Sequence, residues 1–195
     1  MMADNNRKGV LQRALGRGYY PHQLSWLIDN PLRRLVIGPG QFANRLRLTP
    51  SSRVLEIGPG SGYFSVELAR AVPEGQLVLL DLQPEMLDKA RKKLRAFSNV
   101  GYAASDAAKS IPYPDQHFDV ITMVAVLGEI PDREGCLREV FRVLQSGGVL
   151  AIHEHIPDPD RIRFPELCVL LEQAGFRLTR RLGPNWNFTA LFERP

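Results

Sequence analysis

The stretch that most constrains the fold is residues 54–64, in which a short apolar run leads directly into a turn with glycine at every second position. An apolar run bounded by glycines is typical of a buried strand, and the residues after the turn carry apolar side chains at helical spacing. Gly58, Gly60 and Gly62 can adopt positive φ and let a ligand approach the backbone closely. We therefore predict a strand, turn and helix unit whose turn binds a ligand.

The spacing of these glycines narrows the choice of ligand. The dinucleotide fingerprint is Gly-x-Gly-x-x-Gly, and Tyr63 occupies its last glycine position, which disfavours NAD. The sequence instead reads Glu56-x-Gly58-x-Gly60-x-Gly62. In this form it resembles motif I of the class I S-adenosylmethionine (SAM) dependent methyltransferases. In general character it is most similar to the quinone-biosynthesis C-methyltransferases.

A second buried strand over residues 76–81 ends in Asp81, 19 residues after Gly62. A carboxylate at this place can accept hydrogen bonds from both hydroxyls of a ribose. Segments 105–107, 111–121 and 144–150 resemble the family in the same order, so the resemblance extends over residues 45–195. Several ordered motifs are more specific than one glycine turn.

The resemblance implies a site for SAM and its product S-adenosylhomocysteine. It implies that Asp81 holds the ribose and that Leu82 and Met86 flank the adenine. Asp106 and Ala107 would contact the amino edge of the adenine, and Glu56 would belong to the network around the turn and the amino-acid end of the cofactor. A helix cap or a salt bridge is the alternative role for each carboxylate. The complete set expected at the cofactor is Glu56, Gly58, Pro59, Gly60, Gly62, Tyr63, Asp81, Leu82, Met86, Asp106, Ala107 and Val124.

From residue 53 onward, predicted strands and helices alternate, which is typical of an α/β protein with a parallel sheet covered by helices on both faces. The last two strands form a hairpin through residues 183–187. The resemblance implies a Rossmann-like, seven-stranded, mostly parallel sheet of order 3-2-1-4-5-7-6 with strand 7 antiparallel. The expected strands are 53–58, 76–81, 100–104, 118–125, 148–154, 177–183 and 188–193, and the expected helices are 62–72, 84–96, 133–144 and 163–174.

We expect one methyltransferase domain over 1–195, with a helical cover segment over 1–50 and the cofactor-binding core over 51–195. The cover segment is predicted to hold helical pieces at 23–28, 32–37 and 41–48. By resemblance, such a segment covers the cofactor and shapes the acceptor pocket. Trp26, Leu27, Leu35 and Val36 are candidates for lining that pocket, with ordinary packing as the alternative.

Methyl transfer from a sulfonium is an in-line displacement, and alignment of the reactants can contribute about 7–11 kcal/mol. A general base is needed only where the acceptor is a weak acid. His153 and His155 are the candidate catalytic residues because they share one face at the end of the fifth strand, and polar packing is the alternative. We expect no metal there, since two imidazoles lack the third ligand of a catalytic zinc site. Tyr19, Tyr20 and His22 are further candidates for the base.

Charge is distributed unevenly along the chain. Residues 1–53 carry a net charge of +7, residues 54–160 carry −6 and residues 161–195 carry +3. The basic N-terminal segment could attract an anionic substrate, a membrane surface or nucleic acid, or could simply be a solvated face. The basic run over 89–95 suits the C-terminal end of its helix and is interpreted as solvated. Cys136 and Cys168 have no metal-ligand spacing and are expected to be buried, reduced thiols.

These features favour a SAM-dependent methyltransferase that acts on a small-molecule acceptor. The alternatives are an RNA or protein methyltransferase that uses the basic N-terminal segment, and a SAM-binding protein without turnover. Nucleic acid is therefore an open but not a favoured partner. No apolar run reaches the roughly 20 residues that span a bilayer and no signal peptide is present, so we expect a cytoplasmic protein, with peripheral membrane contact left open. The sequence does not identify the acceptor or the oligomeric state.

Overall fold

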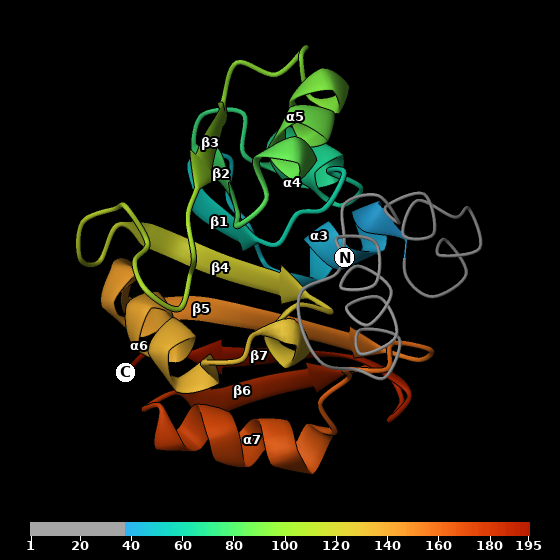
Figure 1. The fold of residues 1–195 in the computed structure, drawn as a ribbon, viewed down its shortest axis with the longest axis vertical. Helices are drawn as coiled ribbons and strands as arrows, with labels where there is room; N and C mark the ends of the chain where they lie inside the picture. Colours follow the sequence, from blue (N-terminus) through green and yellow to red (C-terminus); the bar gives the residue numbers. More distant parts are fainter. Residues whose placement is uncertain (1–37) are drawn as a thin grey trace, which may run out of the picture.

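The computed structural model describes residues 38–195. Within this range, seven strands form one sheet in the order β3-β2-β1-β4-β5-β7-β6 (Figure 1). All neighbouring strands are parallel except β7, which is antiparallel to both β5 and β6. The predicted sheet order and the antiparallel last strand are confirmed. The helical pieces predicted at 23–28 and 32–37 lie outside the described residues.

The strands are β1 (Arg53–Ile57), β2 (Gln76–Asp81), β3 (Val100–Ala104), β4 (Phe118–Val124), β5 (Leu144–His155), β6 (Arg177–Leu182) and β7 (Asn187–Glu193). The helices are α3 (Pro39–Arg45), α4 (Ser65–Ala71), α5 (Pro84–Lys93), α6 (Arg133–Val143) and α7 (Phe164–Gln173), with a short 3-10 turn η3 (Leu127–Glu129) after β4. No helix in this part of the chain is long and apolar enough to cross a membrane.

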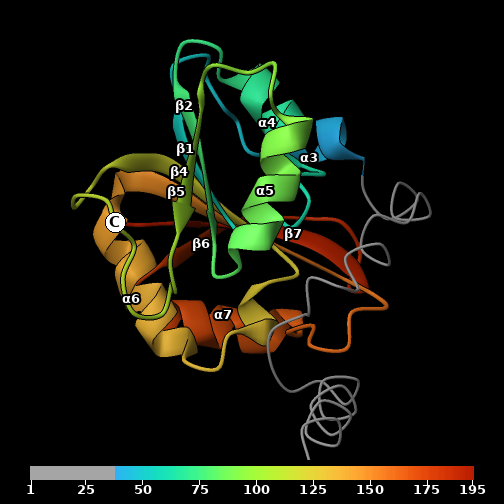
Figure 2. The ribbon, with the colours of Figure 1, turned by 45° about the horizontal axis from the view of Figure 1, so that its top comes forward.

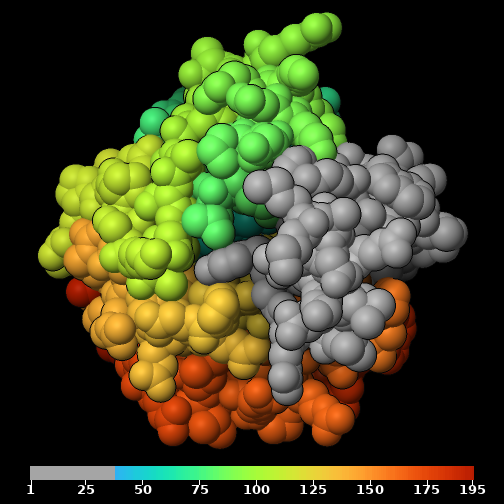
Figure 3. Space-filling model, in the orientation of Figure 1, coloured from blue at the N-terminus to red at the C-terminus, as the bar shows by residue number. Residues whose placement is uncertain are grey.

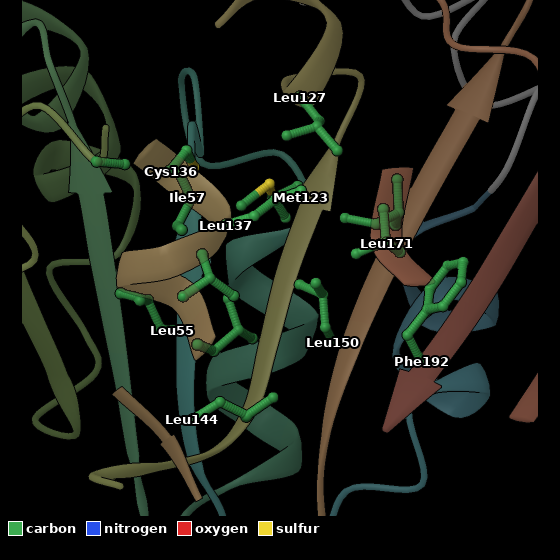
Figure 4. Close-up of a cluster of buried hydrophobic side chains, with 14 of the residues drawn as sticks. Leu55, Ile57, Met123, Leu127, Cys136, Leu137, Leu144, Leu150, Leu171 and Phe192 are labelled. Carbon is green, nitrogen blue, oxygen red and sulfur yellow. The ribbon is translucent and has the colours of Figure 1, made fainter. Parts of the chain in front are cut away.

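Helices cover both faces of the sheet, as predicted. Helices α6 and α7 bury one face through a cluster of apolar side chains from β1, β4, β5 and β7. Figure 4 shows part of this cluster, with Leu55, Met123 and Leu150 of the strands near Leu137 of α6 and Leu171 of α7. Helices α3, α4 and α5 bury the other face through a second cluster (Figure 2).

Some predicted boundaries were wrong for identifiable reasons. Helix α4 begins at Ser65 instead of 62, because Gly62 has a φ of 80° that no right-handed helix accommodates. Strand β5 begins at Leu144 instead of 148, because Leu144 already pairs with Phe118 before a bulge shifts the register. Within that bulge Gly147 has a φ of 76°.

The last piece of the cover segment is also displaced from its prediction. Helix α3 spans Pro39–Arg45 instead of 41–48. Pro39 lies in its first turn, where its fixed φ suits helix formation, and Arg47 with a φ of 54° follows its end. Phe42 and Leu46 are buried against the sheet, so this helix anchors the chain entering the core.

The connections after β1 and β4 leave the sheet on opposite faces. Strand β1 leads into α4, whereas its neighbour β4 leads through η3 into α6. Ligands of open α/β sheets bind outside the carboxyl ends of the strands at such a point. The fold therefore places the glycine turn, the end of β2 and the end of β4 along one edge of the sheet.

Candidate functional site

The glycine turn after β1 has the backbone conformation that the sequence predicted. Gly58, Gly60 and Gly62 have φ angles of 66°, 56° and 80°. The Gly58 N–H donates to the carbonyl of Leu80 over 2.9 Å, which fastens the turn to the end of β2. A side chain at any of these three positions would be strained because left-handed φ angles disfavour a Cβ.

The surroundings of the three glycines differ. A Cβ on Gly58 would lie 2.5 Å from a methyl group of Val126, and one on Gly62 would lie 3.3 Å from the Cα of Ala90 in α5. Among residues 38–195, no atom lies within 4 Å of a Cβ placed on Gly60. Gly58 and Gly62 therefore permit close packing of the protein itself, whereas the backbone at Gly60 is not covered by any residue of the described part of the chain.

The surface is hollowed at this edge. Figure 3 shows a small recess beside the green surface that belongs to the region after β2. The colour at its floor is that of β1 and the glycine turn. The hollow therefore lies over the carboxyl ends of the central strands.

Asp81 is the last residue of β2 and only 9% of it is exposed. One of its carboxylate oxygens accepts a hydrogen bond of 2.9 Å from the backbone N–H of Gln83. Burial raises the pKa of Asp81 to about 6. The next residue, Leu82, is 41% exposed, whereas Met86 of α5 is buried. A buried carboxylate beside an exposed large apolar side chain can bind a molecule that has both hydroxyls and a flat apolar ring.

Glu56 lies on β1 just before the glycine turn and is 2% exposed. The hydroxyl of Ser65, at the start of α4, donates to its Oε2 over 2.5 Å. Burial raises the pKa of Glu56 to about 7, although this hydrogen bond opposes the shift. A carboxylate in this environment gains from a cationic partner, because such a partner would stabilise the charge that burial disfavours.

Asp106 and Ala107 follow β3, the outer neighbour of β2. Asp106 Oδ1 accepts a hydrogen bond of 3.0 Å from the N–H of Ala108, and its Oδ2 lies 3.6 Å from Lys109 Nζ. Asp106 thus has the turn and ion-pair contacts that were the alternative to ligand binding. Its contact with a cofactor stays a prediction.

Tyr63 and Val124 are both close to the glycine turn. The Tyr63 ring packs edge-on against Phe64 at 4.9 Å, and within residues 38–195 its buried hydroxyl has no hydrogen-bond partner. Val124 ends β4 and is buried, and Val126 two residues later packs against Gly58. Pro59 lies within the turn, between two of its glycines.

His153 and His155 lie on the sheet face that α3 covers, and Glu154 between them lies on the other. Their rings stack with centroids 5.6 Å apart. His153 is completely buried beside Phe42, whereas His155 at the end of β5 is 7% exposed. Burial raises the pKa of Glu154 to about 8. Tyr19, Tyr20, His22, Trp26, Leu27, Leu35 and Val36 lie outside the described residues.

The described residues contain no group of three His, Cys, Asp or Glu side chains that could hold a metal ion. Cys136 and Cys168 are both free cysteines; Cys136 is buried, as predicted, whereas Cys168 is only partly buried.

Sequence reasoning missed four contacts at this edge. Two of them involve β1 and its turn: the Ser65 hydroxyl donates to Glu56, and Val126 packs against Gly58. The other two involve basic side chains. Lys93 Nζ donates to Ser61 Oγ over 3.1 Å, and Arg45 donates to Thr189 over 2.8 Å. Lys93 belongs to the basic run that was interpreted as solvated; it is exposed, and its Nζ also reaches the glycine turn. None of these pairs has a short-range sequence signal, because each depends on how distant segments pack.

Comparison with known proteins supports the same family. A family model described as "Methyltransferase domain" matches residues 48–172. The chain is 34% identical over 138 residues to the ubiquinone/menaquinone biosynthesis C-methyltransferase UbiE of Vibrio vulnificus. The matched segment covers 69% of this chain and 51% of that protein. The chain is 38% identical over 141 residues to the protein of the same name from Vibrio campbellii, with the same coverage. The chain thus spans about half the length of these relatives.

A solved structure agrees with this assignment. The crystal structure of a SAM-dependent methyltransferase from Aquifex aeolicus is similar with a TM-score of 0.84 and 25% identity, and the match covers 91% of this chain and all of that chain. The sheet order, the glycine turn and the family match agree with one another. The chain therefore belongs to the class I SAM-dependent methyltransferases.

Proposed function

We propose that this protein transfers a methyl group from SAM to a small-molecule acceptor bound at the carboxyl edge of the sheet. The observation that carries the proposal is the glycine turn, whose backbone at Gly60 is not covered by any residue of 38–195. The turn follows β1, which pairs with β2, and β2 ends at the buried carboxylate of Asp81. The family assignment supports the reaction, and the relatives' names as ubiquinone/menaquinone biosynthesis enzymes support a small-molecule acceptor.

The residues at this edge fit the parts of SAM. The Asp81 carboxylate would accept hydrogen bonds from the ribose hydroxyls, and the exposed side chain of Leu82 would cover one face of the adenine together with Met86. Asp106 and Ala107 would contact the amino edge of the adenine. The ammonium group at the amino-acid end would give the buried Glu56 the cationic partner that its environment favours.

The backbone around Gly60, with Pro59 and Tyr63 beside it, would approach the same amino-acid end. Val124, at the end of β4, would close the site from the next strand.

SAM supplies a methyl group on a positively charged sulfur, which is already a good leaving group. With SAM bound, the bond from sulfur to carbon would break as the acceptor atom bonds to the methyl group, and the acceptor would then lose a proton. The protein's part is to align the acceptor and to exclude water, which can supply about 7–11 kcal/mol. The relatives are named C-methyltransferases, and a carbon acceptor requires a group that removes its proton.

His155 is the better candidate for that group. It stands at the end of β5 and retains some exposure, whereas His153 is completely enclosed. His153 would then support its neighbour instead of meeting the acceptor. The cytoplasmic location inferred from the sequence stays a prediction.

The first test is calorimetric titration of SAM and S-adenosylhomocysteine into the wild type, Asp81→Ala and Asp88→Ala. Asp88 is an exposed acid on α5 and serves as the matched control. We expect binding to the wild type and the control, and a loss of at least about tenfold in affinity for Asp81→Ala. Unchanged binding to Asp81→Ala would contradict the placement of the ribose.

The second test follows transfer of an isotope-labelled methyl group from SAM to hydroxylated aromatic rings, to carboxylic acids and to bulk RNA. Methylation of a small aromatic acceptor would support the proposal, and methylation of RNA alone would contradict it. SAM binding without transfer to any acceptor would indicate a binding protein without turnover.

A further inference from the structure

A chain of hydrogen bonds joins three separate elements behind the histidine pair. Arg45 Nη1 of α3 donates to Thr189 Oγ1 of β7 over 2.8 Å, although the two residues are 144 positions apart. Thr189 Oγ1 in turn lies 3.0 Å from His153 Nδ1 on β5. Thr189 and His153 are directly opposite each other in the sheet, and both are completely buried.

The direction of these bonds follows from the chemistry of the three groups. A guanidinium can only donate, so Arg45 occupies a lone pair of the Thr189 hydroxyl. The hydroxyl has one hydrogen, and within residues 38–195 the acceptor that the structure places for it is His153 Nδ1. A buried hydroxyl that left this hydrogen unused would lose the free energy of a hydrogen bond. Nδ1 of His153 is therefore an acceptor, and the ring hydrogen is on Nε2.

Protonation of His153 at Nδ1 would break this chain of hydrogen bonds. If Nδ1 carried a proton, the hydrogen of the Thr189 hydroxyl could no longer point toward His153. The hydroxyl oxygen would then have to accept hydrogen bonds from both Nδ1 and Arg45. Among the described residues, the charged or titratable groups that face His153 are Arg45 from α3 and the stacked ring of His155 on its own strand. The neighbouring strands contribute Val124 and Thr189, neither of which titrates.

We propose that Arg45 and Thr189 are positioning residues that hold His153 neutral with its hydrogen on Nε2, so that His155 is the member of the pair that exchanges a proton with the acceptor. The second half of this inference rests on the proposed function. The first half concerns the resting protein and can be tested without turnover. Arg45 then serves the site from the half-buried end of α3.

The test is nitrogen-15 NMR of the imidazole rings in the full chain, with His153→Gln used to assign the signals. We expect the wild-type His153 spectrum to show hydrogen on Nε2 and no protonation between pH 5.5 and pH 8. In Thr189→Val, which removes the hydroxyl at nearly constant volume, we expect mixed tautomers and protonation of His153 within that range. Thr189→Ser restores the hydroxyl and should restore the wild-type spectrum.

Thr179→Val is the matched control, because Thr179 on β6 donates to the carbonyl of Leu191 and does not contact the histidines. It should leave the His153 spectrum unchanged, and urea unfolding of both valine variants checks that they fold. Hydrogen on Nδ1 in the wild type would overturn the proposal. So would a folded Thr189→Val variant with the wild-type His153 spectrum.

Activity measurements separate this inference from the proposed function. Thr189→Val should lower kcat by about tenfold and shift its pH profile, with the KM for SAM unchanged, because only the orientation and charge of the histidine pair are altered. An unaltered pH profile would overturn the role of His155. A wild type with the expected spectrum but without any methyl transfer would overturn the proposed function and leave the positioning of His153 intact.

Discussion

At the scale of the residue, the glycines of the turn make different demands. Gly60→Ala is expected to lower the free energy of unfolding by only about 1–2 kcal/mol, because its φ is positive but its surroundings are open. The same change should weaken SAM binding by at least about tenfold, because the new methyl group would occupy the space of the ligand. Urea unfolding and calorimetry measure the two effects separately.

Gly58→Ala provides the contrasting variant. Its Cβ would lie 2.5 Å from Val126, so we expect a loss of about 2–5 kcal/mol in the free energy of unfolding.

For the Gly60→Ala variant, an unchanged SAM affinity would show that the ligand does not approach the turn at Gly60.

The carboxyl of Asp81 should make SAM binding dependent on pH. Ribose hydroxyls donate to the ionised form, and the pKa of Asp81 in the free protein is raised to about 6. Below pH 6, affinity should therefore fall by up to about tenfold per pH unit from this group. Asp81→Asn should bind more weakly at pH 8 and lose this dependence, whereas Asp88→Asn should retain it. An unchanged slope in Asp81→Asn would assign the effect to another group.

Residue roles could be predicted from the sequence where a local backbone geometry dictates them. The positive φ angles of Gly58, Gly60 and Gly62 follow from a turn that only glycine forms without strain, and they were predicted. The contact between Arg45 and Thr189 could not be predicted, because it depends on α3 packing beside the last strand. The burial of His153 likewise becomes visible only when Phe42 is placed beside it.

At the scale of the element, the alternation of strands and helices was predictable because apolar runs and glycine turns mark each unit. The boundaries of the elements were less predictable. Strand β5 starts directly after α6, because Leu144, the first residue of β5, pairs with β4 before the bulge. The structure also places no helix between β3 and β4, where Ala107 and Ile111 pack against the α6 face instead. Tertiary contacts decide such details.

One side chain, that of Arg194, donates to several carbonyls at the C-terminal end of α6. Arg194 Nη1 donates to the carbonyls of Phe141, Arg142 and Leu144 over 2.7, 3.2 and 2.5 Å. Arg194→Met should lower the free energy of unfolding by about 2 kcal/mol, because carbonyls at the helix end lose a charged donor. SAM affinity should not change, since this end of β5 is opposite the site.

Urea unfolding and SAM calorimetry test this prediction together. Arg138→Met, an exposed change in the same helix, is the control and should have little effect on stability. A loss of SAM binding in a folded Arg194→Met variant would contradict the separation between the two edges of the sheet.

At the scale of the whole molecule, the sheet gathers buried acids along its carboxyl edge. Burial raises the pKa of Glu56 from 4.5 to about 7 and that of Glu154 from 4.5 to about 8. Between the unfolded and folded values, the folded protein retains protons that the unfolded chain has released. Its stability therefore falls as pH rises through this interval, and the full cost is present above the folded pKa.

Replacing one of these acids by its amide should therefore stabilise the ligand-free protein in one pH range only. Glu56→Gln keeps an acceptor for Ser65 and removes the charge, so the free energy of unfolding should rise by about 2 kcal/mol at pH 8 and change little at pH 5. Urea unfolding at both pH values measures this, with exposed Glu85→Gln as control. Under the proposed function the same variant should bind SAM more weakly at pH 8, because the ammonium group loses its anionic partner. Glu56 would then serve binding at the expense of the stability of the fold. If Glu56→Gln lowered the free energy of unfolding equally at pH 5 and pH 8, that conclusion would be wrong.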